Sequence, residues 1–94
     1  MFKTAKIWQG TGIELYREGY RGTRSISFEK RDIGKAIHAI AFVLKQSPGS
    51  GTYVRGTSIS RTHTTIRMED YQGRKISIRL SEAPEVVEIL GKYL

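Results

Sequence analysis

Two stretches of the chain alternate apolar and polar residues on either side of a short turn. Residues 13–17 and 64–68 alternate before the turns, and residues 24–28 and 74–80 alternate after them. A period of two predicts strands. Both turns contain a tyrosine followed two residues later by a glycine, at Tyr20 and Tyr71. The pattern therefore predicts a strand, a tight turn and a strand, written twice.

After each of these hairpins the apolar period becomes helical. Residues 29–46 predict a first helix, and a last helix begins near Ser81 with Pro84 in its first turn, where proline is tolerated. A further strand is predicted before each hairpin, over residues 2–9 and 53–60. The apolar stripe of the first helix, which we expect to face the sheet, is Ile33, Ile37, Ile40 and Leu44.

These elements predict an α+β fold with an antiparallel sheet backed by two helices. The chain of 94 residues is too short for two independent cores, so we expect one domain over residues 1–94. It would consist of two β-β-β-α repeats, with repeat one over 1–46, a Ser-, Pro- and Gly-rich linker over 47–51, and repeat two over 52–94.

The net charge of the chain favours a binding function. The chain has 16 Lys and Arg against 9 Asp and Glu, a net charge of +7, and such an excess in a small domain is typical of nucleic-acid binders. There is no cysteine and no long apolar run. We therefore expect an intracellular protein of the cytoplasm, nucleoid or nucleus that needs no membrane, cofactor or metal.

The predicted hairpins place cations and aromatic rings on the sheet face away from the helices. Arg67, Lys75 and Arg79 share the outer face of the second hairpin. Single-stranded DNA or RNA is bound by cations that contact phosphates and by rings on which bases stack. We predict binding with little sequence preference. The predicted nucleic-acid-binding residues are Tyr16, Tyr20, Arg21, Arg24, Arg67, Tyr71, Arg74, Lys75 and Arg79.

Catalysis has little support in the sequence. His38 and His63 lie far apart, and no cysteine accompanies them. Glu69 and Asp70 are neighbours on a predicted strand, so their side chains point to opposite faces and cannot share a proton or a metal. We therefore predict that the protein is not an enzyme.

The run from Ile13 to Ile40 resembles the C-terminal domain of the positive cofactor four transcriptional coactivators, and Ile66 to Leu90 is similar to the same pattern. The resemblance implies a curved antiparallel sheet backed by helices, single-stranded DNA or RNA binding, a role in transcription and a dimer, as in the related Whirly and Pur groups. The chain departs from the family in having three predicted strands before each helix where the coactivator domain has four.

Phe42 projects away from the predicted core stripe of the first helix. With Ala39 and Val43 it forms a candidate homodimer interface. Two alternative functions stay open. One is a protein-interaction or inhibitory module, viral or regulatory, that uses Phe42 and the sheet edge; the other is a protein that binds structured RNA.

Overall fold

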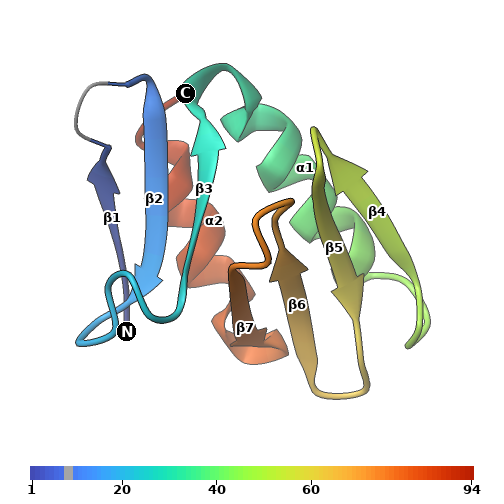
Figure 1. The fold of residues 1–94 in the computed structure, drawn as a ribbon. Coiled ribbons are helices and arrows are strands. Elements are labelled where there is room, and N and C mark those ends of the chain that lie inside the picture. Colours follow the sequence, from blue (N-terminus) through green and yellow to red (C-terminus); the bar gives the residue numbers. More distant parts are fainter. Residues whose placement is uncertain (8–9) are drawn as a thin grey trace.

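The structure, a computed structural model, describes residues 1–7 and 10–94 and begins with a three-stranded antiparallel sheet (Figure 1). Its strands are β1 (Phe2–Lys6), β2 (Gly12–Arg17) and β3 (Ser25–Glu29), in the order β1-β2-β3. A 3-10 turn over Lys30–Asp32 leads into α1 (Ile33–Leu44). The end of the predicted first strand, Trp8 and Gln9, lies outside the described residues.

A second antiparallel sheet has four strands in the order β4-β5-β6-β7. They are β4 (Gly51–Val54), β5 (Thr57–Arg61), β6 (Thr65–Glu69) and β7 (Lys75–Arg79), followed by a 3-10 turn over Leu80–Glu82 and by α2 (Ala83–Gly91). The α+β class is thus confirmed, with two sheets in place of one. The repeat holds loosely, because the second unit has four strands before its helix and the first has three.

The fourth strand of the second unit arises from a turn that the sequence pattern did not predict. Residues 53–60 are not one strand; they turn at Arg55 and Gly56, whose φ angles are 42° and 81°. Two residues with positive φ form the type I′ connection that matches the twist of a hairpin. Gly56 marks this turn, whereas Arg55 is a residue that rarely adopts such a φ. Tyr53 to Ser60 therefore supplies parts of both β4 and β5.

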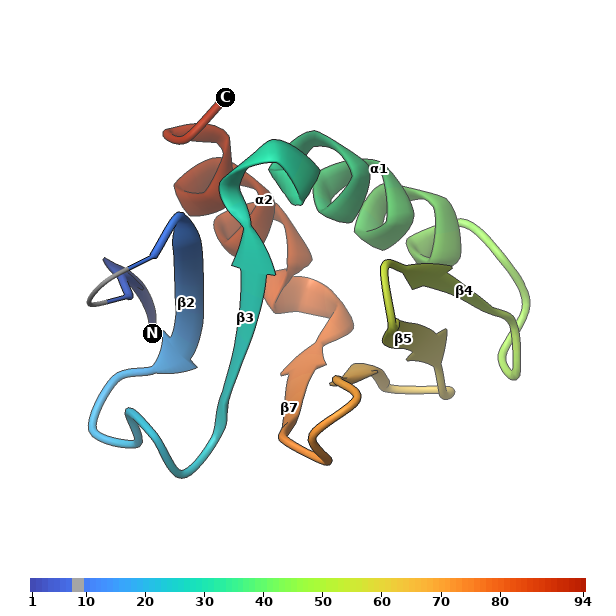
Figure 2. The ribbon, with the colours of Figure 1, turned by 45° about the horizontal axis from the view of Figure 1, so that its top comes forward.

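Each helix packs on the sheet of the other unit. The helix that follows the first sheet, α1, contacts β4 and β5, while α2 contacts β1, and the two helices pack against each other on the same side of both sheets (Figures 1 and 2). The buried apolar residues of both units form one cluster. This exchange explains how two short units share a core that neither could form alone.

The first helix buries a different face from the one that the sequence predicts, because Ile33 and Ile40 of the predicted stripe are buried whereas Ile37 and Leu44 are only half-buried. Because it packs on a sheet and on α2, its buried residues are Ile33, Ala36, Ala39, Ile40 and Val43. Val43 is 0% exposed, so its assignment to a surface interface is wrong, whereas Ala39 is 6% exposed and lines a shallow cleft beside Phe42. Phe42 alone of the three is exposed, at 46%.

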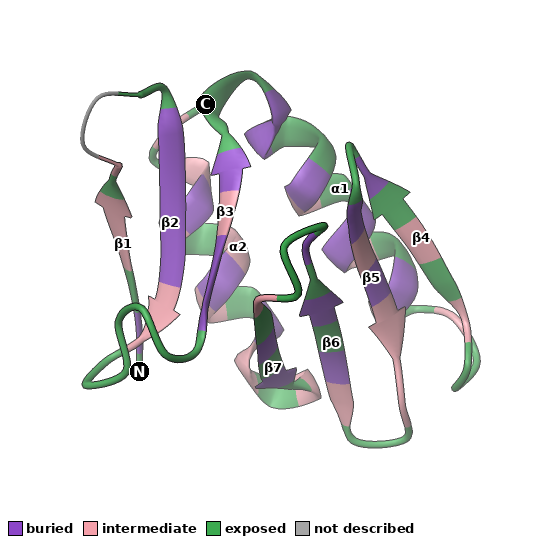
Figure 3. Cartoon of the chain, in the orientation of Figure 1, coloured by how far each residue is buried: buried purple, intermediate pink, exposed green. Residues whose placement is uncertain are grey.

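Strand alternation in the second hairpin agrees with prediction. Ile66, Met68, Ile76 and Ile78 are buried, and the positions between them face outward (Figure 3). No helix among the described residues is long and apolar enough to cross a membrane.

Candidate functional site

A groove runs along the edge strand of the second sheet and is bounded on its other side by the turn between β2 and β3. β3 ends the first sheet and β7 ends the second, and the two strands lie side by side (Figures 1 and 2). Within the described chain, backbone pairing joins β3 only to β2 and β7 only to β6. The cavity along β7 has a volume of about 920 Å³, and its lining runs from β7 and Thr65 to Arg17 at the end of β2 and to the turn between β2 and β3. One wall is thus a strand edge with unpaired backbone groups, and the opposite wall is that turn.

The groove is lined by cations. Among the described residues that line it there are five basic side chains and no acidic one; they are Arg17, Arg24, Arg74, Lys75 and Arg79. Tyr20 supplies an aromatic ring, and Thr23, Thr65 and Ser77 supply hydroxyls. Of the nine residues that we predicted to bind nucleic acid, Tyr20, Arg24, Arg74, Lys75 and Arg79 come together here.

Three of these cations have carboxylate partners. Arg17 pairs with Glu82 at 3.0 Å, Arg74 with Asp70 at 2.8 Å, and Lys75 reaches Glu69 at 3.8 Å. Arg24 and Arg79 make no ion pair with any described residue, and the Arg24 guanidinium lies 4.9 Å from the centre of the Tyr20 ring. The guanidinium groups of Arg24 and Arg79 are therefore not neutralised by a neighbouring carboxylate of the described chain and can pair with an anionic ligand.

The two tyrosine turns project on the side away from the helices (Figure 2). Both turns join two neighbouring antiparallel strands, but the turn between β2 and β3 is longer than the turn between β6 and β7. In the first, Tyr20 is 45% exposed and its carbonyl accepts hydrogen bonds from the N–H groups of Thr23 and Arg24, at 3.0 and 2.9 Å. In the second, Tyr71 is 81% exposed.

A second cavity of about 290 Å³ lies at the end of β3, next to the Tyr71 turn. Arg74 lines both cavities, so they follow one another along the groove. The turn is held by Asp70, whose Oδ1 accepts hydrogen bonds from the N–H groups of Gln72 and Arg74, both at 3.0 Å. Tyr71 lines this second cavity.

The outer face of the first sheet is less open than predicted. The Arg21 Nε donates to Glu14 Oε1 at 2.8 Å, and the Arg21 guanidinium lies 5.6 Å from the centre of the Tyr16 ring. Glu14 and Ser25 are buried, and Tyr16 is half-buried. The Glu14 carboxylate raises the pKa of Arg21. Arg21 and Tyr16 thus cover the sheet and do not line the groove.

Arg67 is exposed on the outer face of the second sheet, where it pairs with Ser77 across β6 and β7. It lies outside the lining of the groove. Two arginines that the sequence did not single out line the cavities, Arg17 and Arg55. Alternation places Arg17 on the same face as Ile13 and Leu15, and Arg55 fell inside a predicted strand, so neither looked like a binding residue.

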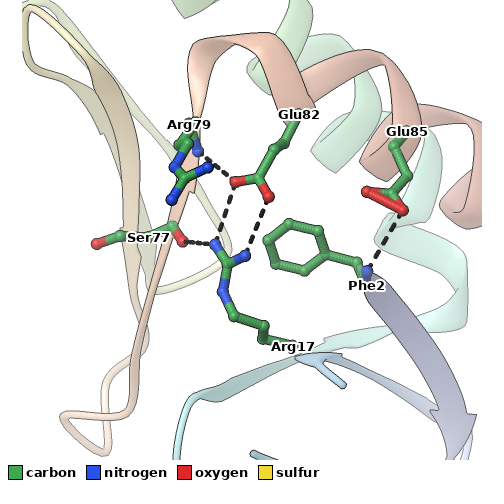
Figure 4. Close-up of polar contacts among 6 residues, drawn as sticks. All are labelled: Phe2, Arg17, Ser77, Arg79, Glu82 and Glu85. Carbon is green, nitrogen blue, oxygen red and sulfur yellow. Dashed lines mark hydrogen bonds and ion pairs between the residues drawn. The ribbon is translucent and has the colours of Figure 1, made fainter. Parts of the chain in front are cut away.

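Arg17 connects the two halves of the molecule (Figure 4). Its guanidinium donates to both carboxylate oxygens of Glu82, at 3.0 and 3.1 Å, and to the Ser77 carbonyl at 3.1 Å, and it lies 4.4 Å from the centre of the Phe2 ring. Glu82 also accepts from the Arg79 N–H at 2.8 Å. We call Arg17 and Glu82 the clasp, because the pair joins β2 to the turn after β7.

The clasp shifts the titration of both partners. Hydrogen bonding to Arg17 lowers the pKa of Glu82 below its ordinary value of 4.5, although partial burial acts in the opposite direction. Hydrogen bonding to Glu82 in turn raises the pKa of Arg17. Both groups are therefore charged at neutral pH, and the clasp holds one wall of the groove against the other.

No family model, curated protein or solved structure matches this chain. The resemblance to the coactivator domain therefore stays a prediction. Within the described part of the chain, no group of three or more His, Asp or Glu side chains is placed to hold a metal ion. The groove is thus the feature of the structure from which a function is argued.

Proposed function

We propose that this protein binds single-stranded nucleic acid, without catalysis and with little sequence preference, in the groove between β7 and the turn that joins β2 to β3. The observation that carries the proposal is the lining of this groove: five basic side chains, an exposed tyrosine and no acidic side chain among the described residues. Cations track phosphates, rings stack on bases, and the small hydroxyl residues let the strand approach the sheets.

The position of the helices favours single strands over duplex. A helix that reads duplex DNA must enter the major groove with basic residues. Here both helices lie on the side of the sheets away from the two tyrosine turns, and α2 carries Glu85 and Glu88 (Figure 2). The second unit also has four strands before its helix, the number found in the coactivator domain that the sequence resembles.

The test is fluorescence anisotropy with labelled single-stranded DNA, single-stranded RNA, duplex DNA and a folded RNA, each at several salt concentrations. Tighter binding of the unstructured strands, weakening steeply with salt, is the expected result. Preference for folded RNA would support a structured-RNA protein. Salt-insensitive binding of a protein, without nucleic-acid binding, would support the interaction module.

Loss of one stacking ring should weaken binding and leave its salt dependence unchanged. Stacking contributes about 1–3 kcal/mol per base, so Tyr20→Leu or Tyr71→Leu should lower affinity by about five-fold to about 150-fold. The control is His63→Leu, since His63 is an exposed aromatic side chain between β5 and β6 that lies outside the groove and outside the second cavity. Equal losses in all three variants would contradict a stacking role for the turns.

We also propose a homodimer through β4 and Phe42. β4 is the outer edge of its sheet, far from the groove, and its sequence Gly-Thr-Tyr-Val has no charge or proline to block pairing (Figure 1). A shallow cleft of about 360 Å³ beside it is lined by Phe42, Tyr53 and His38, among others. Two copies of one edge can pair about a two-fold axis.

Phe42→Glu should convert this dimer to monomer, because the substitution puts a charge into an apolar contact. The measurement is mass by analytical ultracentrifugation, and the control is Lys45→Glu, at an exposed lysine directly after α1 that does not line the cleft. A wild-type protein that sediments as a monomer, or a Phe42→Glu variant of unchanged dimer mass, would contradict this interface.

A further inference from the structure

The cavity at the end of β3 differs from the open groove beside it. Its walls come from β3, from the hairpin turn between β4 and β5, and from the Tyr71 turn. Its volume of about 290 Å³ is at the lower limit of ligand pockets, about 300 Å³. It therefore suits one small group better than several linked nucleotides.

Two guanidinium groups in this cavity are fixed by buried aspartates. Arg55 Nε donates to Asp32 Oδ2 and Arg74 Nε donates to Asp70 Oδ2, each at 2.8 Å. The two aspartate side chains are only 4% and 3% exposed, whereas the arginine side chains are 55% and 40% exposed. Each carboxylate thus holds its arginine by Nε, and the Nη groups make no hydrogen bond with any described residue.

The backbone at Arg55 gives an independent indication. Its φ of 42° is the left-handed region, where Asn or Gly is favoured in a type I′ turn and a long side chain is unusual. Unfavourable backbone angles of this kind concentrate at ligand sites, where the side chain they place is used. The turn aims a guanidinium at Asp32 and the cavity, which an Asn in the same turn would not do.

The charges in the cavity favour a neutral ligand over a phosphate. Each guanidinium is already paired with an aspartate, and Glu29 adds a further negative charge. What the site still offers is a set of oriented N–H donors beside an exposed ring, Tyr71. Paired N–H donors of arginine match two neighbouring acceptor atoms on the edge of a base.

We propose that this cavity, which we call the base pocket, takes one unstacked base of the strand bound in the groove, and that Arg55 and Arg74 donate hydrogen bonds to its acceptor edge. The inference rests on the proposed function. Guanine and cytosine each present two neighbouring acceptors, whereas adenine and thymine alternate acceptors with donors. The protein should therefore add a local preference at one position to otherwise permissive binding.

The experiment uses a dT oligonucleotide of about 12 nucleotides, within the usual site sizes of about 4–16, with one central dT, dG, dC or dA. Bidentate base contacts discriminate by about 1–3 kcal/mol. By anisotropy, the strands with dG or dC should bind about five-fold to about 150-fold more tightly than those with dT or dA. Arg55→Asn, which suits the turn, should abolish this difference and leave affinity for all-dT and its salt slope close to wild type.

Arg31→Asn is the matched control, because Arg31 is an exposed arginine next to Asp32 that does not line the pocket. It should keep the preference. If Arg55→Asn alone does not fold, the double variant Asp32→Asn and Arg55→Asn removes the guanidinium group without leaving the buried Asp32 carboxylate unpaired. Equal affinity for all four strands, or a preference that survives in the folded variant, overturns the base pocket alone. Absence of single-strand binding overturns it together with the proposed function.

Discussion

Replacing Arg24, Lys75 and Arg79 with glutamine should flatten the salt dependence of single-strand binding by about two units of log K against log salt. Each phosphate contact on a single strand contributes about 0.7 to this slope, because it releases condensed counterions. These three cations line the groove; the guanidinium groups of Arg24 and Arg79 make no ion pair with a described residue, and Lys75 has only a long contact with Glu69, at 3.8 Å. At about 50 mM salt the same change should weaken binding by about 100-fold or more.

The matched control removes the same charge from the other side of the molecule. Lys35, Lys45 and Lys92 are exposed, on or next to the helices. Replacing all three with glutamine should leave both the slope and the affinity close to wild type, because these lysines do not contact phosphates of a strand bound in the groove. If both triples reduce the slope equally, binding follows net charge and the groove is not the site.

Much of the fold could be predicted because local patterns determine it. The alternation of Ile66, Met68, Ile76 and Ile78 places one face of the second hairpin in the core, and the structure buries all four. The turn at Arg55 and Gly56 escaped because its first position is an arginine, whereas Asn-Gly or Asp-Gly is the usual signal. Residue propensities predict a positive φ for Gly and Asn, so they do not predict a turn whose first residue is an arginine with a positive φ.

The arrangement of the helices lies beyond such patterns. The period of α1 predicts one buried stripe, but α1 packs on β4 and β5 and on α2, so Ala39 and Val43 are buried. Ile37 and Leu44 of the predicted stripe are only half-buried. A helix that crosses to the sheet of the other unit has the same amphipathic sequence as one that packs on its own. The prediction that Val43 lies at a surface interface failed because α1 packs on the sheet of the other unit, which the sequence pattern does not reveal.

The candidate site shows the same division. Arg24, Lys75 and Arg79 were found from strand parity and turn position, which are local. The groove itself exists because β7, the last strand of the second sheet, stays unpaired beside the turn between β2 and β3. Arg17 lines it through a bond to Glu82, a partner far along the chain. Alternation assigns Arg17 to the core face, and only the tertiary structure shows the gap at the sheet boundary into which its guanidinium projects.

Breaking the clasp should have the largest effect on stability. Arg17→Met keeps apolar contact with Phe2 but removes three hydrogen bonds from a charged group and leaves the half-buried Glu82 unpaired. Hydrogen bonds to charged groups contribute about 1.5–3 kcal/mol. We expect the free energy of unfolding to fall by about 2–3 kcal/mol and the melting temperature by about 10–20 °C, measured by circular dichroism. Arg31→Met, at an exposed arginine, should change it little.

The pH dependence of stability tests the same pair from the acid side. The pKa of Glu82 is lowered in the folded protein, so the folded state holds this carboxylate deprotonated where the unfolded chain would protonate it. Its contribution is therefore fully present above about pH 4.5 and is lost as the pH falls through the folded pKa. Glu82→Gln should lower stability at pH 7 and make the acid limb of the stability curve shallower, whereas Glu88→Gln, an exposed glutamate on α2, should leave that limb unchanged. An acid limb with the same slope in wild type and Glu82→Gln would show that the Arg17–Glu82 pair does not hold the two halves together in solution.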